Sequence, residues 1–130
     1  MRYSELTRRY FAAAADTAGR LEGAGVARGA AGSRAEGTWV QFDVRIDRAA
    51  ADGPRVAAAR FLAFGCPHTI AAAAWVAEQA VGRVPEPALP QSAQALRRLF
   101  EMPVEKLGRL LIVEDAWLAA VRGDGAKSEH

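Results

Sequence analysis

The chain has 130 residues, a length that suits a single domain. Its hydrophobic fraction of 51% and charged fraction of 25% exclude an intrinsically disordered protein. The formal net charge is only +2, and lysine and arginine are spread along the chain without a dense basic run, which argues against nucleic-acid binding. The charged N-terminal segment does not resemble a signal peptide, and no apolar stretch is long enough to span a membrane.

The first predicted element is a helix over residues 3–21. Apolar side chains such as Leu6 and Tyr10 recur there at helical spacing, and Ser4 can support the start of the helix. The following stretch, residues 22–37, is rich in glycine and alanine. We expect it to be a loop with a short edge strand near Val26.

A change to alternating polar and apolar residues predicts two strands after this loop. The first strand begins at Thr38, and the apolar side chains on one of its faces are Val40, Phe42, Val44 and Ile46. The residues on its other face are Trp39, Gln41, Asp43 and Arg45. This alternation is typical of a half-buried strand. The turn sequence Asp52-Gly53-Pro54 separates it from a second alternating run over residues 56–64, which predicts an antiparallel hairpin.

The second half of the chain is predicted to be helical. Pro67 suits the first turn of a helix that runs to about Val81, and Gly82 is a suitable stop. After a proline-rich connector, Ser92 can cap a short helix and Pro103 can open a final one.

This order of helix, strands and helices predicts an α+β domain. We expect a small antiparallel sheet of about three strands, with the helices packed on one of its faces. Residues 1–123 are predicted to form this single domain, and residues 124–130 to form a polar C-terminal tail.

The chain has a single cysteine, Cys66, at the junction between the second predicted strand and the helix that follows. One cysteine cannot form an intramolecular disulfide, which favours a reducing compartment and a cytoplasmic protein. The amides and dipole of a helix N-terminus stabilise a thiolate, the form that binds metal or attacks sulfur. A buried structural cysteine explains this position equally well.

His68 lies two residues after Cys66 and is predicted to be a solvated polar residue in the first turn of the helix. A histidine there could also be a metal ligand. The spacing Cys-Pro-His is not by itself a strong metal motif, because a stable site needs three or four ligands that converge in space.

Several segments resemble the IscU/NifU-type iron–sulfur scaffold proteins. The segment Arg60-Phe61-Leu62-Ala63-Phe64-Gly65-Cys66, followed by an alanine-rich helix with Trp75-Val76, resembles the central strand and helix of that family. The further matching segments are Tyr3-Ser4-Glu5, Lys106-Leu107-Gly108-Arg109 and Ile112-Val113-Glu114-Asp115-Ala116. The resemblance implies the family's fold and a role in iron–sulfur cluster assembly.

Members of this family hold a [2Fe–2S] cluster, iron or zinc with three cysteines, an aspartate and often a histidine. Cys66 matches the second cysteine. The positions of the first cysteine, the aspartate, the histidine and the third cysteine fall on Glu36, Thr38, Gly108 and Arg109, respectively. The resemblance therefore implies a vestigial site at Thr38, Gly108 and Arg109, with Cys66 as its one remaining thiolate.

These departures argue against a stable cluster within one chain. Iron–sulfur clusters are held by thiolates, and Arg109 places a permanent cation where a metal would bind. We expect Glu36 and Arg109 to form an ion pair across the vestigial site. The segment Met102–Lys106, which matches the family's chaperone-docking element, carries Glu105 in place of an apolar residue.

The favoured hypothesis is a protein without enzymatic activity that acts in cluster assembly by binding partners, a cysteine desulfurase among them. The alternative is a carrier of zinc, iron or persulfide sulfur that uses Cys66, with Glu36 and His68 as further metal ligands. A homodimer could also place two copies of Cys66 at a bridged [2Fe–2S] cluster. The third hypothesis is a thiol enzyme with Cys66 as nucleophile and His68 as base, which lacks an orienting third group.

Overall fold

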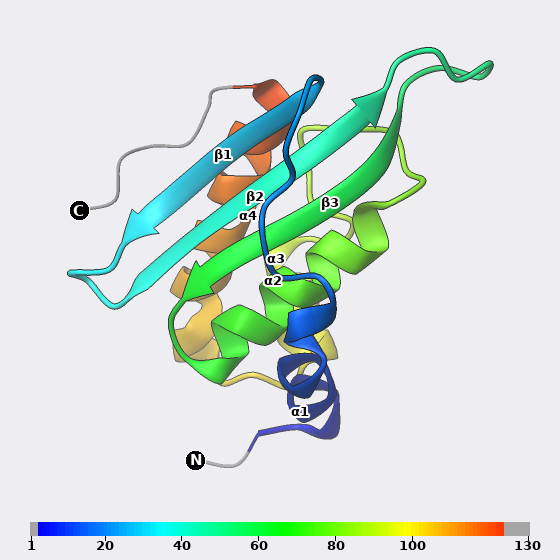
Figure 1. Ribbon diagram of the computed structural model, residues 1–130. Helices are drawn as coiled ribbons and strands as arrows, with labels where there is room; N and C mark the ends of the chain where they lie inside the picture. Colours follow the sequence, from blue (N-terminus) through cyan, green and yellow to red (C-terminus); the bar gives the residue numbers. More distant parts are fainter. Residues whose placement is uncertain (1–2, 124–130) are drawn as a thin grey trace.

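The computed structural model describes residues 3–123, which form a three-stranded antiparallel sheet with helices on one face (Figure 1). The elements in chain order are α1 (Glu5–Ala12), the 3-10 turn η1 (Ala14–Asp16), β1 (Val26–Ser33), β2 (Thr38–Asp47), β3 (Arg55–Phe64), α2 (Pro67–Ala80), α3 (Ala93–Leu99), the 3-10 turn η2 (Val104–Lys106) and α4 (Leu107–Arg122). The strand order is β1-β2-β3, with α4 packed on β1 and β2 and α2 on β3. The predicted α+β class is confirmed, and the predicted tail over residues 124–130 lies outside the described part of the chain.

The hairpin of β2 and β3 forms as its alternation predicts. The strands pair from Trp39 with Phe64 to Asp47 with Arg55, and the connecting turn contains Gly53, whose φ of 106° suits glycine. Val40, Phe42 and Val44, the central side chains of the apolar face, are fully buried against the helices.

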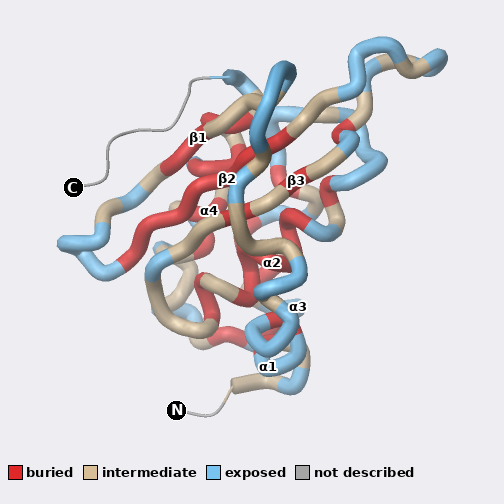
Figure 2. Tube along the Cα trace, in the orientation of Figure 1, coloured by how far each residue is buried: buried red, intermediate tan, exposed pale blue. Residues whose placement is uncertain are grey.

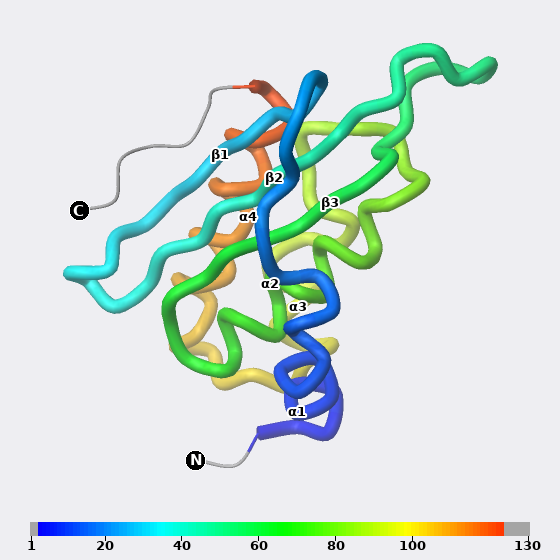
Figure 3. Tube along the Cα trace, in the orientation of Figure 1, coloured from blue at the N-terminus to red at the C-terminus, as the bar shows by residue number. Residues whose placement is uncertain are grey.

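The prediction of a half-buried β2 is wrong. Gln41 and Asp43 point to the face away from the helices, yet they are only 2% and 1% exposed. Residues 17–25, which we call the crossing segment, run over this face of the sheet between η1 and β1 (Figure 3). The sheet is therefore covered on both sides, and the buried stretch along β2 is visible in Figure 2.

The first helix is shorter than predicted. Ser4 caps it as expected by accepting a hydrogen bond from the Thr7 N–H, but α1 ends at Ala12 rather than near residue 21. The chain instead hydrogen-bonds to the outer edge of β3, where Gly19 donates to the Phe61 carbonyl and Phe61 donates to the Thr17 carbonyl. These long-range backbone bonds replace the local ones that a longer helix would make.

The edge strand predicted near Val26 is confirmed, but it is longer than expected and replaces much of the predicted loop between residues 22 and 37. β1 is eight residues long and pairs with β2 along its whole length, from Val26 with Arg45 to Ser33 with Thr38. The small residues that suggested a loop allow α4 to approach closely. A Cβ at Gly29 would fall on the backbone of Ala119 and Ala120.

Proline, serine and glycine predict the bounds of α2 and the start of α3. Pro67 is the first residue of α2, and Gly82 follows that helix with a φ of 87°. Ser92 caps α3 by accepting a hydrogen bond from the Ala95 N–H. Pro103 precedes the short turn η2 rather than α4 itself. No helix among the described residues is long and apolar enough to cross a membrane.

Polar contacts hold the crossing segment on the sheet. Each strand contributes one arginine whose side chain donates to a carbonyl of the segment: Arg28 to Leu21, Arg45 to Glu22 and Arg60 to Ala18. These contacts tie the segment to all three strands.

Asp43 is the acceptor at the centre of these contacts. Its carboxylate accepts hydrogen bonds from the Leu21 N–H at 2.9 Å and from two nitrogens of Arg28 at 2.8 Å. Burial alone would raise the pKa of Asp43, but the hydrogen bonds from Arg28 and Leu21 outweigh it and hold the pKa below its ordinary value.

Gly29→Ala should lower the free energy of unfolding by about 3 kcal/mol or more, because the added methyl group meets the α4 backbone and cannot be accommodated by a side-chain rotation. Urea unfolding followed by circular dichroism measures this. Gly108→Ala is the matched control: it lies in α4 with nothing near its Cβ and should raise stability by up to about 1 kcal/mol. If Gly29→Ala leaves the free energy of unfolding unchanged, the close packing of α4 on β1 is contradicted.

Asp43→Asn should cost about 2 kcal/mol, less than the ~3–5 kcal/mol of a fully buried pair, because the Arg28 side chain is 30% exposed. The lowered pKa of Asp43 also means that its stabilising contribution is present above about pH 4 and is lost as pH falls through the folded-state pKa. Thermal melts from pH 7 to pH 3 should therefore show a steeper acid loss in the wild type than in Asp43→Asn. Parallel curves for the two proteins would show that Asp43 does not contribute in this way.

Candidate functional site

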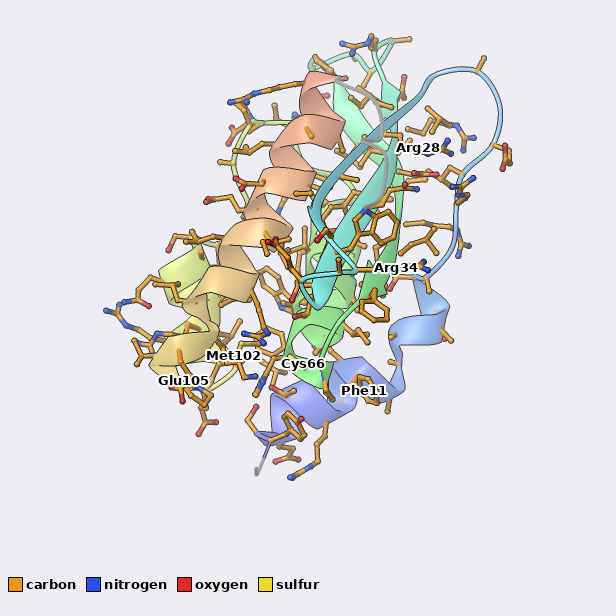
Figure 4. The ribbon with its side chains drawn as sticks, turned by 90° about the vertical axis from the view of Figure 1, so that its left-hand side faces the viewer. Phe11, Arg28, Arg34, Cys66, Met102 and Glu105 are labelled. Carbon is orange, nitrogen blue, oxygen red and sulfur yellow. The ribbon has the colours of Figure 1, made fainter. Side chains whose placement is uncertain are left out.

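Cys66 lies where the sequence places it, between the end of β3 and the start of α2. It is the N-cap residue of α2, with an extended backbone conformation at φ −76° and ψ 167°, and Pro67 follows as the first helical residue. Figure 4 places it at the end of the sheet where the strand passes into the helix. The helix N–H groups therefore face the cysteine, as predicted for a thiolate at this junction.

The thiol of Cys66 is half-buried and has two polar neighbours. Its Sγ lies 3.7 Å from the Thr69 hydroxyl and accepts from Lys106 Nζ at 3.9 Å. Burial alone would raise the pKa of this thiol. The N–H and hydroxyl of Thr69, the N–H of His68 and the charge of Lys106 together outweigh burial and lower the pKa below its ordinary value. The site therefore favours the thiolate.

His68 is buried, which corrects the prediction of a solvated residue. Its side chain is only 1% exposed and packs edge-on against the ring of Tyr3 at 4.7 Å between ring centroids. Burial lowers the pKa of His68, and the positive charges of Lys106 and Arg109 lower it further. The imidazole is therefore neutral at physiological pH.

Arg109 comes from the first turns of α4 and lies close enough to His68 to act on its charge state. The Nε atom of Arg109 is buried and makes no hydrogen bond to any described residue. Gly108, its neighbour in the chain, is exposed. The structure thus brings Cys66, His68, Lys106 and Arg109 together, which we call the Cys66 cluster.

The predicted ion pair between Glu36 and Arg109 is not formed among the described residues. Glu36 is exposed in the turn between β1 and β2, where its N–H donates to the Ser33 hydroxyl. Thr38 is buried at the start of β2. The family resemblance predicts which positions match, but it does not predict where their side chains lie, and the charged side chains of Glu36 and Arg109 form no ion pair with each other.

Residues 3–123 contain no group of three or more histidine, cysteine, aspartate or glutamate side chains that could hold a metal ion. Metal binding by Cys66, Glu36 and His68 therefore stays a prediction. Among the described residues, the Thr69 hydroxyl and the cationic side chain of Lys106 contact Cys66. Arg109 acts on the neighbouring His68.

Two members of this environment were not assigned to the site from the sequence. Thr69 lies three residues after Cys66, in the first turn of α2. Helical spacing could therefore have predicted that its side chain lies near the thiol. Lys106 is 40 residues away in the chain, and the sequence places it in two segments that match the family without giving it a role at Cys66. No spacing rule links it to Cys66, because its position depends on the packing of α4 against the sheet.

The sequence matches the family described as the NifU-like N-terminal domain over residues 5–128. Among solved structures, it is similar to a proposed iron–sulfur cluster assembly scaffold protein for the SUF system from the thermophile Fervidobacterium islandicum AW-1. That similarity has 16% identity and a TM-score of 0.48, and it covers 93% of this chain and 92% of that one. A second similar structure is that of a hypothetical protein, with 20% identity, a TM-score of 0.42 and coverage of 89% and 83%. The search of the curated proteins returned no match.

Lys106→Gln and Thr69→Val should each raise the pKa of Cys66, because each removes a group that stabilises the thiolate. The rate of alkylation by iodoacetamide, followed by mass spectrometry as a function of pH, reports this pKa. At pH 7 both variants should react more slowly than the wild type. Arg122→Gln, which removes a charge from the far end of α4, is the control and should match the wild type. Faster alkylation in Lys106→Gln would contradict the assignment.

Proposed function

Because the chain belongs to the family of NifU-like N-terminal domains, we propose that it acts in iron–sulfur cluster assembly in the cytoplasm by binding partner proteins, without holding a cluster of its own. The family match extends over residues 5–128 and supports a role in cluster assembly. The proposal assigns no catalytic step to the chain.

The observation that carries this proposal is the pair of cations in the Cys66 cluster. Lys106 Nζ approaches the thiol at 3.9 Å, and Arg109 stands where the family resemblance expects the third cysteine. Thiolates are the groups that hold iron–sulfur clusters, and metal ions are repelled by fixed positive charge. One thiol in contact with a cation, with a second cation acting on the neighbouring His68, is therefore a poor cluster site.

Exposed apolar side chains beside the site support the partner-binding role. Phe64, two residues before Cys66, is 45% exposed, and Val104, two residues before Lys106, is 66% exposed. Exposed apolar groups next to charged ones are typical of protein interfaces. Since the family receives sulfur from a cysteine desulfurase, we propose that enzyme, or another cluster-assembly protein, as the partner.

A second candidate function is a sulfur carrier, and the lowered pKa of Cys66 favours it. In that role the Cys66 thiolate attacks the terminal sulfur of a desulfurase persulfide. A new S–S bond forms at Cys66, the old S–S bond breaks, and the cysteine of the desulfurase leaves as a thiolate. The two candidates differ in whether Cys66 is required.

Anaerobic reconstitution with iron and sulfide tests the missing cluster site. We expect no stoichiometric iron, zinc or acid-labile sulfide in the wild type or in Cys66→Ala. A variant that combines Glu36→Cys, Thr38→Asp and Arg109→Cys restores the ligand types of the family at the matching positions, and it should bind a cluster and absorb visible light. Stoichiometric metal in the wild type that is lost in Cys66→Ala would overturn the proposal and favour a metal carrier.

Binding to a cysteine desulfurase separates the two functions. By analytical ultracentrifugation, the partner-binding proposal expects wild type and Cys66→Ala to form the same complex. The carrier proposal expects a mass increase of one sulfur on Cys66 after incubation with desulfurase and cysteine, and loss of function in Cys66→Ala. Val104→Asp, which places a charge on the exposed apolar surface beside the site, should weaken the complex with the desulfurase under both proposals.

A further inference from the structure

The Cys66 cluster contains both buried side-chain nitrogens that make no hydrogen bond among the described residues, His68 Nδ1 and Arg109 Nε. Buried polar atoms in native proteins are nearly always hydrogen-bonded. An unsatisfied one costs roughly 1–3 kcal/mol. Their occurrence together at one place, rather than scattered over residues 3–123, indicates a site that is completed by a ligand.

The charge of the cluster indicates what kind of ligand fits. Lys106 and Arg109 each carry a positive charge, and Cys66 is the one side chain of the cluster that can carry a negative charge. No carboxylate within residues 3–123 forms an ion pair with Lys106 or Arg109. The cluster therefore has at least one unbalanced positive charge, and the N-terminus of the 14-residue α2 adds to the positive potential.

The hydrogen-bond donors of the cluster also limit which class of ligand it can bind. An arginine guanidinium binds planar or tetrahedral oxyanions with parallel N–H donors, and a lysine ammonium adds a point charge. The buried Nε–H of Arg109 is a donor without an acceptor, and a neutral imidazole can donate from Nδ1. The cluster as a whole thus offers an oxyanion two cations and two buried nitrogens that have no partner among the described residues.

We propose that the Cys66 cluster binds a small oxyanion, a phosphate, sulfate or carboxylate, with Arg109 as the principal donor and with Lys106 and His68 beside it. Lys106 Nζ lies 3.9 Å from Sγ, so an oxyanion that Lys106 helps to hold limits access to the thiol. This binding site goes beyond the proposed function, since it requires neither a protein partner nor a cluster.

Isothermal titration calorimetry of the full chain with inorganic phosphate, sulfate and acetate tests the proposal, with ionic strength held constant by potassium chloride. We expect saturable binding of at least one of the three. Arg109→Gln should weaken it at least about tenfold, the loss expected for a charge-assisted hydrogen bond. Arg122→Gln, at the other end of α4, should bind like the wild type. Preference for acetate would identify a carboxylate ligand, and preference for phosphate or sulfate a free inorganic anion.

Protection of Cys66 from iodoacetamide provides a second measurement on the wild-type chain, which stays decisive if Arg109→Gln does not fold. Saturating oxyanion should slow alkylation in the wild type, and the protection should be weaker in Lys106→Gln. No saturable binding and no protection by any of the three anions would overturn the proposal. If Arg109→Gln and Arg122→Gln weaken anion binding equally, the proposal is overturned as well, because the anion then responds only to the net charge of the protein.

Discussion

The close contact between α4 and β1 at Gly29 determines where the chemical groups of this protein lie. Because a side chain at this position would collide with the backbone of Ala119 and Ala120, only glycine lets the C-terminal part of α4 lie directly on the sheet. A 16-residue α-helix is a nearly rigid rod, so its position against β1 also determines where it begins. The start of the helix places Arg109 by His68, and the turn just before it brings Lys106 to the cysteine at the end of β3.

The two faces of the sheet are held by different kinds of interaction. Val40, Phe42 and Val44 bury their side chains against the helices, where the hydrophobic effect stabilises the contact. The crossing segment on the other face is held by the Leu21 N–H bond to Asp43 and by arginine donors to its carbonyls, and the Arg28–Asp43 ion pair between β1 and β2 supports these contacts. The crossing segment therefore depends in part on the ionisation of one buried carboxylate.

Local patterns in the sequence were sufficient for the β2–β3 hairpin, for the start of α2 at Pro67 and for the position of Cys66 between them. They failed where long-range contacts decide the structure. The length of β1 is underestimated because its small residues resemble a loop, although Gly29 is required by contact with α4. The predicted first helix is too long because its continuation pairs with Phe61. His68 was expected in solvent because its burial depends on Tyr3 and on α4, not on its neighbours in the chain. A position in a family pattern likewise did not reveal that Glu36 is exposed and forms no ion pair with Arg109 among the described residues.

Arg109, at the position where the family resemblance expects a third cysteine, gives the site a different chemistry. Two or three thiolates near one another repel and are stabilised by a metal cation, whereas a single cysteine with two cations in its cluster leaves a positive charge that favours an anion. The same backbone geometry, with a cysteine at the N-terminus of α2 and the start of α4 beside it, thus supports opposite ligand preferences. The sign of the charge on the α4 side chains, more than the fold, decides which ligand this end of the sheet can hold.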